Sequence, residues 1–204
     1  MLEIIRRLDL TEQREIVSTV KELIRSAPLF QKTMPRTGTP FNYRCSNAGP
    51  FGWTSDIEGG YRYVDRHPLT HQPWPTIPPP ILKIVRFVTS VIGEPYYRAD
   101  TCLINCYNQH GTVGIHQDNT ESYLEPAIIS ISLGADQDFC YGGSRRSIPY
   151  SVRLRSGDVL VMSGEHRMSW HGVPKPPIPD TGPTEPIGLK PGHRIALTIR
   201  QVTR

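Results

Sequence analysis

Six short segments between Thr101 and Gln201 alternate apolar and polar side chains with a period of two residues. This period is typical of β-strands, whereas a helix repeats about every 3.6 residues. Turns rich in glycine, such as YGGSRR and RSGD, lie between the segments. The sequence therefore predicts strands at residues 101–107, 113–117, 128–133, 151–154, 158–162 and 194–201.

The first hundred residues contain two segments with helical periodicity instead. In residues 11–26 the apolar positions fall three or four apart, Thr11 is available as an N-terminal cap, and Pro28 follows the end. A second amphipathic segment follows the proline run 78–80 and ends at Gly93. Helices followed by many strands favour an α+β fold in which the helices buttress a sandwich of sheets.

The length and composition are those of one soluble domain. A chain of 204 residues can bury a substantial core, and a net charge of +4 permits a polyanionic partner without requiring one. The four cysteines form no CxxC pair, which suggests a reducing compartment. The N-terminus is interrupted by charges and no run reaches 18 apolar residues, so we expect no signal peptide and no membrane span. We expect a cytoplasmic protein.

His116 and Asp118 are two positions apart, and in an extended strand their side chains point to the same side. An imidazole and a carboxylate at this spacing can bind one ion together if a third ligand joins them. His171 lies 53 residues beyond Asp118, far enough for intervening strands to bring it back. The three residues form a candidate 2-His-1-carboxylate triad, as in non-haem Fe(II) oxygenases. Taken alone, a His-x-Asp pair is more often a surface pair without a metal, and the same three ligands can also bind zinc.

Two of the predicted strands have one polar face. Residues Arg194, Ala196, Thr198 and Arg200 share a side of the last strand, opposite three apolar residues. This face could simply meet water, as in many antiparallel sheets. Alternatively it could line a pocket, where the guanidinium groups would hold an anionic co-substrate through paired hydrogen bonds. The candidate triad favours the pocket.

With these residues the sequence resembles the AlkB-type Fe(II)/2-oxoglutarate-dependent dioxygenases, which repair alkylated nucleic acids. The resemblance covers about three quarters of the chain, from about Phe51 to the C-terminus. The matching segments are FGWT, GGYRY, PWP, CLINCY, HQDNTE, ISISLG, FCYGG, SGDVLVMSGEHRMSWHG and HRIALTIRQ. It implies one dioxygenase domain, residues 1–204. Residues 1–95 would form a helical buttress and a nucleotide-recognition lid, and residues 96–204 a double-stranded β-helix (jelly roll) that carries catalysis.

The resemblance also implies roles for individual residues. The iron ligands would be His116, Asp118 and His171, which together with Arg200 would be the catalytic residues. Contacts to 2-oxoglutarate would come from Asn105, Tyr107, Arg194 and Arg200. Contacts to the nucleic acid would come from Trp53, Tyr61, Glu121 and Arg146. Judged one at a time, aromatic residues such as Trp53 and Tyr61 are more often core residues than base contacts, and Arg146 could be part of a solvated turn.

Three positions depart from the best-known pattern of that family. Ala196 stands where an asparagine would contact the co-substrate, and Thr120 stands where an acidic residue commonly follows HQDx. Met162 replaces a frequent aromatic residue. These departures affect the co-substrate cavity and the choice of base.

The implied reaction is oxidative demethylation of bases such as 1-methyladenine and 3-methylcytosine in DNA, a form of DNA repair. It would consume 2-oxoglutarate and O2 at Fe(II) and release formaldehyde and succinate. Two further functions stay open: the same chemistry on RNA, tRNA or a small molecule, and a non-catalytic jelly-roll module that keeps a metal for stability. The expected partner is methylated DNA, single-stranded or duplex, or else RNA, and we expect a monomer.

Overall fold

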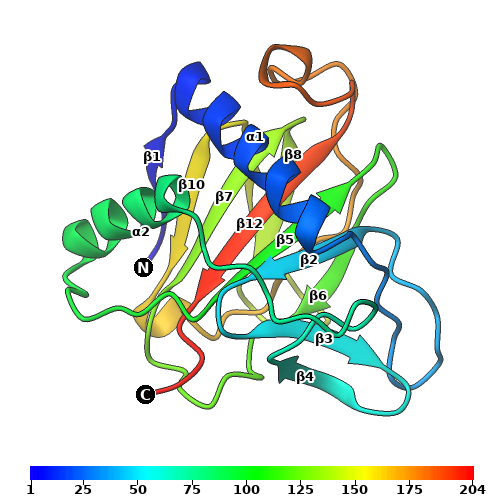
Figure 1. Ribbon diagram of the computed structural model, residues 1–204. Coiled ribbons are helices and arrows are strands. Elements are labelled where there is room, and N and C mark those ends of the chain that lie inside the picture. The colour runs from blue at the N-terminus through cyan, green and yellow to red at the C-terminus, as the bar shows by residue number, and fades with distance from the viewer.

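Two antiparallel β-sheets form the centre of the fold in the computed structural model, which describes residues 1–204 (Figure 1). The larger sheet has the strand order β1 (Leu2–Arg7), β10 (Asp158–Met162), β7 (Ile128–Gly134), β12 (Arg194–Arg200), β5 (Thr101–Tyr107) and β2 (Arg44–Ala48). The smaller sheet has the order β6 (Val113–His116), β11 (His171–Val173), β8 (Gln137–Tyr141) and β9 (Tyr150–Leu154). A separate hairpin is formed by β3 (Gly52–Asp56) and β4 (Gly60–Val64). The two sheets form the expected jelly roll, and all six predicted strands are present within one residue of their predicted ends.

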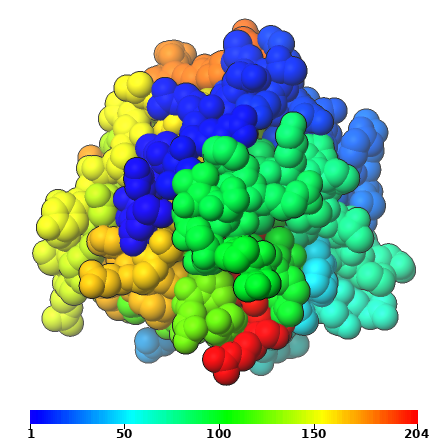
Figure 2. Space-filling model, turned by 90° about the vertical axis from the view of Figure 1, so that its left-hand side faces the viewer, coloured from blue at the N-terminus to red at the C-terminus, as the bar shows by residue number.

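Two helices, α1 (Leu10–Ser26) and α2 (Pro79–Ile92), cover the outer face of the larger sheet (Figure 1). Helix α2 ends as predicted at Gly93, whose φ of 75° suits a residue without a side chain. Seen from the left-hand side of Figure 1, the segment that contains α2 adjoins the N-terminal segment of β1 and α1 (Figure 2). Two short 3-10 helices complete the chain, η1 (Gly164–His166) and η2 (Glu185–Ile187). None of the helices is long and apolar enough to cross a membrane.

Helix α1 begins two residues earlier than Thr11 would place it. Asp9 is the N-cap: its carboxylate accepts a hydrogen bond from the Glu12 amide at 2.9 Å, and the Glu12 side chain accepts from the Asp9 amide at 3.1 Å. This reciprocal pair is a capping box. The expectation that Thr11 caps the helix is therefore wrong, because Thr11 lies inside the first turn.

We expect Asp9→Ala to lower the free energy of unfolding by about 1 kcal/mol, the usual cost of losing an N-cap. For a chain of this length the melting temperature should fall by about 2–4 °C. Thermal unfolding checks this, with Thr11→Ala as the matched control. Equal losses in the two variants would contradict the assignment of Asp9 as the cap.

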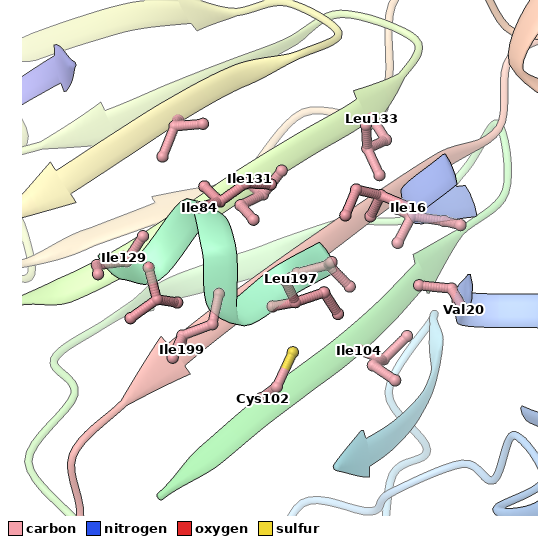
Figure 3. Packing of buried hydrophobic residues seen from close by; sticks show 14 of the residues in the cluster. Ile16, Val20, Ile84, Cys102, Ile104, Ile129, Ile131, Leu133, Leu197 and Ile199 are labelled. Atoms are coloured by element: carbon pink, nitrogen blue, oxygen red, sulfur yellow. The ribbon is translucent and has the colours of Figure 1, made fainter. Parts of the chain in front are cut away.

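The main hydrophobic core lies between the helices and the outer face of the larger sheet (Figure 3). Ile16 and Val20 of α1 and Ile84 of α2 meet Leu197 and Ile199 of β12 there. Each such side chain contributes roughly 1.5–3 kcal/mol by leaving water. The apolar side of β12 thus packs against the helices, and its polar side faces the smaller sheet.

The sequence did not predict β1, which forms the edge of the larger sheet. Its segment LEIIRR carries two arginines, and its pairing with β10 is interrupted by an irregularity between Ile4 and Arg6. Such an edge strand has no clean alternation for a sequence reading to detect. Both β1 and β2 lie within residues 1–95, so the larger sheet draws on both parts of the expected division at residue 95.

Candidate active site

A cavity of about 1020 Å³ lies between the two sheets. The polar face of β12 lines it, and so does the face of β5 that carries Leu103, Asn105 and Tyr107. These strands are neighbours in register, with Ala196 opposite Asn105 and Arg194 opposite Tyr107. The polar faces that could have met water therefore line a pocket.

His116, Asp118 and His171 converge in this cavity. His116 ends β6 and His171 begins β11, and the two residues are direct partners across these antiparallel strands. His116 Nε2 lies 3.5 Å from Asp118 Oδ1, and His171 Nε2 lies 3.6 Å from Asp118 Oδ2. One ligand atom from each residue lies within 4.8 Å of the others, so a single ion can contact all three.

Backbone carbonyls orient both imidazoles. His116 Nδ1 lies 2.8 Å from the Gly114 carbonyl oxygen, and His171 Nδ1 lies 2.9 Å from that of Ser169. A proton on each Nδ1 leaves the Nε2 lone pair directed toward Asp118, which is the tautomer that a metal requires. Gly172 permits the close approach of β11 to β6, because a Cβ there would lie 2.8 Å from the Gly114 carbonyl oxygen.

Asp118 is buried and ionised. Burial by itself would raise its pKa, but Arg200 and the two histidines outweigh this and hold the pKa well below its usual range. Arg200 Nη2 lies 2.6 Å from Asp118 Oδ2. The loop that carries Asp118 is held by the buried Arg167, which donates to the Asp118 carbonyl oxygen at 2.8 Å and to that of Pro126 at 2.9 Å. The carboxylate is therefore ready to bind a cation.

Arg194 is a buried cation without an acidic partner. It is 2% exposed, donates to Ser132 Oγ at 2.7 Å and to the Ala135 carbonyl oxygen at 3.3 Å, and its Nε has no partner in the protein. Burial lowers its pKa to about 10. Asn105 Oδ1, on the neighbouring strand, is also buried without a partner. An unpaired guanidinium in a cavity that also holds a metal triad fits a carboxylate-bearing co-substrate.

Two aromatic residues of the β3–β4 hairpin line the same cavity. The rings of Trp53 and Tyr61 are nearly parallel, with an interplanar angle of 13° and centroids 5.6 Å apart. Trp53 Nε1 donates to Thr120 Oγ1 at 3.0 Å, and the buried Lys32 places its Nζ 4.3 Å from the centroid of the Trp53 ring. The indole is thus held from two sides, so its position over the cavity is well defined.

Comparison with known proteins agrees with this geometry. Residues 4–200 match the family model described as "2OG-Fe(II) oxygenase superfamily". An α-ketoglutarate-dependent dioxygenase AlkB homolog of Caulobacter vibrioides is 39% identical over 195 residues, which are 95% of this chain and 84% of that protein. The chain belongs to the AlkB family. It is accordingly a dioxygenase that uses Fe(II), 2-oxoglutarate and O2.

One solved structure and two relatives that match part of the chain also belong to this comparison. The structure of OsALKBH1 matches with a TM-score of 0.81 and 27% identity, over 98% of this chain and 97% of that chain. Two partial matches have names that state a substrate. The DNA N(6)-methyladenine demethylase ALKBH1D of Arabidopsis thaliana is 40% identical, over 52% of this chain and 25% of that protein. The tRNA demethylase abh1 of Schizosaccharomyces pombe is 36% identical, over 57% and 42%.

Two of the residues expected to contact nucleic acid lie outside the cavity lining. The Glu121 side chain is 0% exposed, and it lies between Arg200 and Arg167 instead of facing the cavity. Arg146 is exposed in the β8–β9 turn, and its neighbour Arg145 is the one that lines the cavity. The departures Ala196, Thr120 and Met162 all line it. Thr120 therefore lines the cavity itself and also accepts the hydrogen bond that holds the indole of Trp53.

Sequence reasoning missed Tyr63 and Arg167. Tyr63 donates to Glu121 Oε1 at 2.6 Å, and Arg167 supports the loop of Asp118. A tyrosine in GGYRYV and an arginine in GEHRMS carry no local signal, because their partners are 58 and 49 residues away. Only their place within family motifs could have drawn attention to them.

Proposed function

We propose that the protein oxidatively demethylates alkylated bases in DNA, of the 1-methyladenine and 3-methylcytosine type, with release of formaldehyde and succinate. The observation that carries this proposal is a single cavity that holds the metal triad, the unpaired Arg194 and the aromatic rings of Trp53 and Tyr61. The triad and Arg194 serve the oxidation, and the flat rings suit a base that has left its stack.

The hairpin supplies the binding surface for that base. Stacking on an aromatic side chain contributes roughly 1–3 kcal/mol per base. A methylated ring that carries a positive charge is also attracted to aromatic faces. At the mouth, Arg145 lines the cavity and Arg146 is exposed beside it, where both can meet the phosphate backbone.

When bound, Fe(II) with 2-oxoglutarate and O2 supplies the oxidation of the N-methyl carbon, and the hydroxymethyl product then sheds formaldehyde. The residues of the chain position the reactants. Arg194 neutralises a co-substrate carboxylate at the buried end of the cavity, and the fixed tautomers of His116 and His171 aim their Nε2 atoms at the ion. Asp118 stays ionised because Arg200 accompanies it.

RNA is the second candidate substrate, because one partial relative is named a tRNA demethylase. A stacking face accepts a base from either nucleic acid, and single-stranded RNA presents its bases readily.

We further propose that the protein acts as a monomer in the cytoplasm.

The test is formaldehyde release from an oligodeoxynucleotide that carries one 1-methyladenine or 3-methylcytosine. We expect release with Fe(II) and 2-oxoglutarate, and none when 2-oxoglutarate is omitted or when His116→Ala replaces the native protein. His110→Ala is the matched control, since His110 is exposed and lies outside the cavity lining. Oligoribonucleotides of the same sequence and free methylated nucleosides are assayed in parallel. Turnover confined to RNA or to nucleosides would overturn the assignment to DNA.

A further inference from the structure

Tyr63, Glu121 and Arg200 form one hydrogen-bonded cluster from three distant parts of the chain. The Tyr63 hydroxyl donates to Glu121 Oε1 at 2.6 Å and accepts from Arg200 Nη1 at 3.1 Å. Arg200 Nη1 also donates to Glu121 Oε1, at 3.0 Å. Tyr63 comes from β4, Glu121 from the loop after β6, and Arg200 from the end of β12.

The cluster is buried and charged, so its geometry is costly to change. The Glu121 side chain is fully buried and that of Arg200 is 7% exposed. Arg167 Nη2 lies 3.4 Å from Glu121 Oε2, so the carboxylate sits between two guanidinium groups. Burial and the carboxylate of Glu121 raise the pKa of Tyr63 above its usual value and outweigh the opposite effect of Arg200, so the phenol keeps its proton and can donate. Charge-assisted hydrogen bonds in such surroundings are about twice as strong as neutral ones.

Tyr63 connects this cluster to the residues that line the mouth of the cavity. In the β3–β4 hairpin, Tyr63 is the direct register partner of Trp53, and Tyr61 is two residues away on the same strand. Arg200, at the other end of the connection, lines the cavity and contacts Asp118 of the metal triad. The position of the hairpin and the orientation of the Arg200 guanidinium are therefore linked through one phenol and one carboxylate.

We propose that Tyr63 and Glu121 are positioning residues that couple the binding of 2-oxoglutarate to the binding of nucleic acid. The inference rests on the proposed function and adds a cooperative order to it. A co-substrate and metal that restrain Arg200 and Asp118 also restrain Tyr63, and with it the hairpin over the cavity. The nucleic acid then meets an ordered hairpin, so less conformational entropy is lost when it binds. By linkage, the nucleic acid strengthens 2-oxoglutarate binding by the same factor.

The first test needs no nucleic acid. Amide hydrogen exchange of residues 52–64 is measured in protein loaded with Mn(II), with and without 2-oxoglutarate. In the native protein we expect 2-oxoglutarate to slow exchange in the hairpin by about 5-fold or more. In Tyr63→Phe, which keeps the ring but removes both hydrogen bonds, we expect no such slowing. Equal protection in Tyr63→Phe and the native protein would overturn the proposal.

Tyr97→Phe is the matched control. Its hydroxyl donates a partly buried hydrogen bond to the Ile199 carbonyl oxygen at 3.1 Å, so it neighbours Arg200 along β12 but contacts neither Glu121 nor the hairpin. We expect this variant to respond to 2-oxoglutarate as the native protein does. Loss of the response in Tyr97→Phe as well would assign the effect to general loosening of the sheet and would overturn the proposal.

The second test measures the coupling itself. The dissociation constant of 2-oxoglutarate is determined with Mn(II), with and without an oligodeoxynucleotide that carries 1-methyladenine. We expect the ratio of the two constants to be about 5 or more in the native protein and about 1 in Tyr63→Phe and Glu121→Gln. A ratio that Tyr63→Phe leaves unchanged would overturn the coupling. If the native protein binds no oligonucleotide, the proposed function fails, and the exchange experiment still decides whether Tyr63 links the two ends.

Discussion

His116→Ala should lose Fe(II) binding and turnover while keeping its fold. His116 supplies one of only three protein ligands, and both remaining ligands would have to hold the ion without it. Removing a residue that merely supports a ligand typically costs 10- to 100-fold in metal affinity or activity, so removing the ligand itself should cost more than about 100-fold. The fold should survive, because the His116 side chain is 40% exposed and its loss leaves no closed cavity in the core.

The measurement is an anaerobic titration with Fe(II) and 2-oxoglutarate. The native protein should develop a metal-to-ligand absorption band, and His116→Ala should not. Thermal unfolding of the metal-free proteins should show melting temperatures within a few degrees of each other. His110→Ala provides the control for loss of a histidine elsewhere. A full band in His116→Ala would remove His116 from the ligand set, and no band in the native protein would favour zinc.

Arg194→Met should have two effects of opposite sign. The 2-oxoglutarate affinity should fall by about 2–5 kcal/mol, which is roughly 30-fold or more, because one partner of a buried charged pair is lost. In the absence of co-substrate, however, the variant should be more stable than the native protein. The native protein buries this guanidinium without an acidic hydrogen-bond partner, and burial lowers its pKa to about 10. Methionine removes the cost of burying the charge while filling similar space.

Calorimetric titration with 2-oxoglutarate and thermal unfolding without it measure the two effects separately. The melting temperature should rise by about 2–4 °C for each kcal/mol gained. Arg153→Met is the matched control, since Arg153 is half exposed on β9 and pairs with Asp138 at the surface. An unchanged affinity in Arg194→Met would show that the co-substrate carboxylate lies elsewhere. A lower melting temperature would show that the hydrogen bonds to Ser132 and Ala135 outweigh the burial of the charge.

The contrast between the two arginines of β12 explains why these variants should differ. Arg200 is accompanied by Asp118 and Glu121, and these neighbours outweigh burial and raise its pKa. Its removal would leave Asp118 without a guanidinium partner and Glu121 with Arg167 alone, so Arg200 serves the fold and the metal triad as well as the cavity. Arg194 donates hydrogen bonds only to neutral groups, the Ser132 hydroxyl and the Ala135 carbonyl oxygen. Of the two, Arg194 is therefore the clean probe of co-substrate binding.

The sequence by itself determined the features that depend on local periodicity. The alternation in β5 and β12 identified both the strands and their two faces, because a strand places every second side chain on one side. The spacing of His116 and Asp118 indicated a shared ligand direction for the same reason. The separation of His171 from Asp118 and the shared face of Arg194 and Arg200 suggested the third ligand and the co-substrate contacts, and the family motifs then gave the same residues these roles.

Only the tertiary structure decided which of these residues meet and what else surrounds them. It paired His171 with His116 across two strands, buried Glu121 away from the cavity, and joined Tyr63 to Arg200 over 137 positions of sequence. It also gave Arg200 two carboxylate partners and left Arg194 without one. The burial of a side chain and its ion pairs depend on residues that lie far apart in the chain. They are therefore set only when the strands have come together in register.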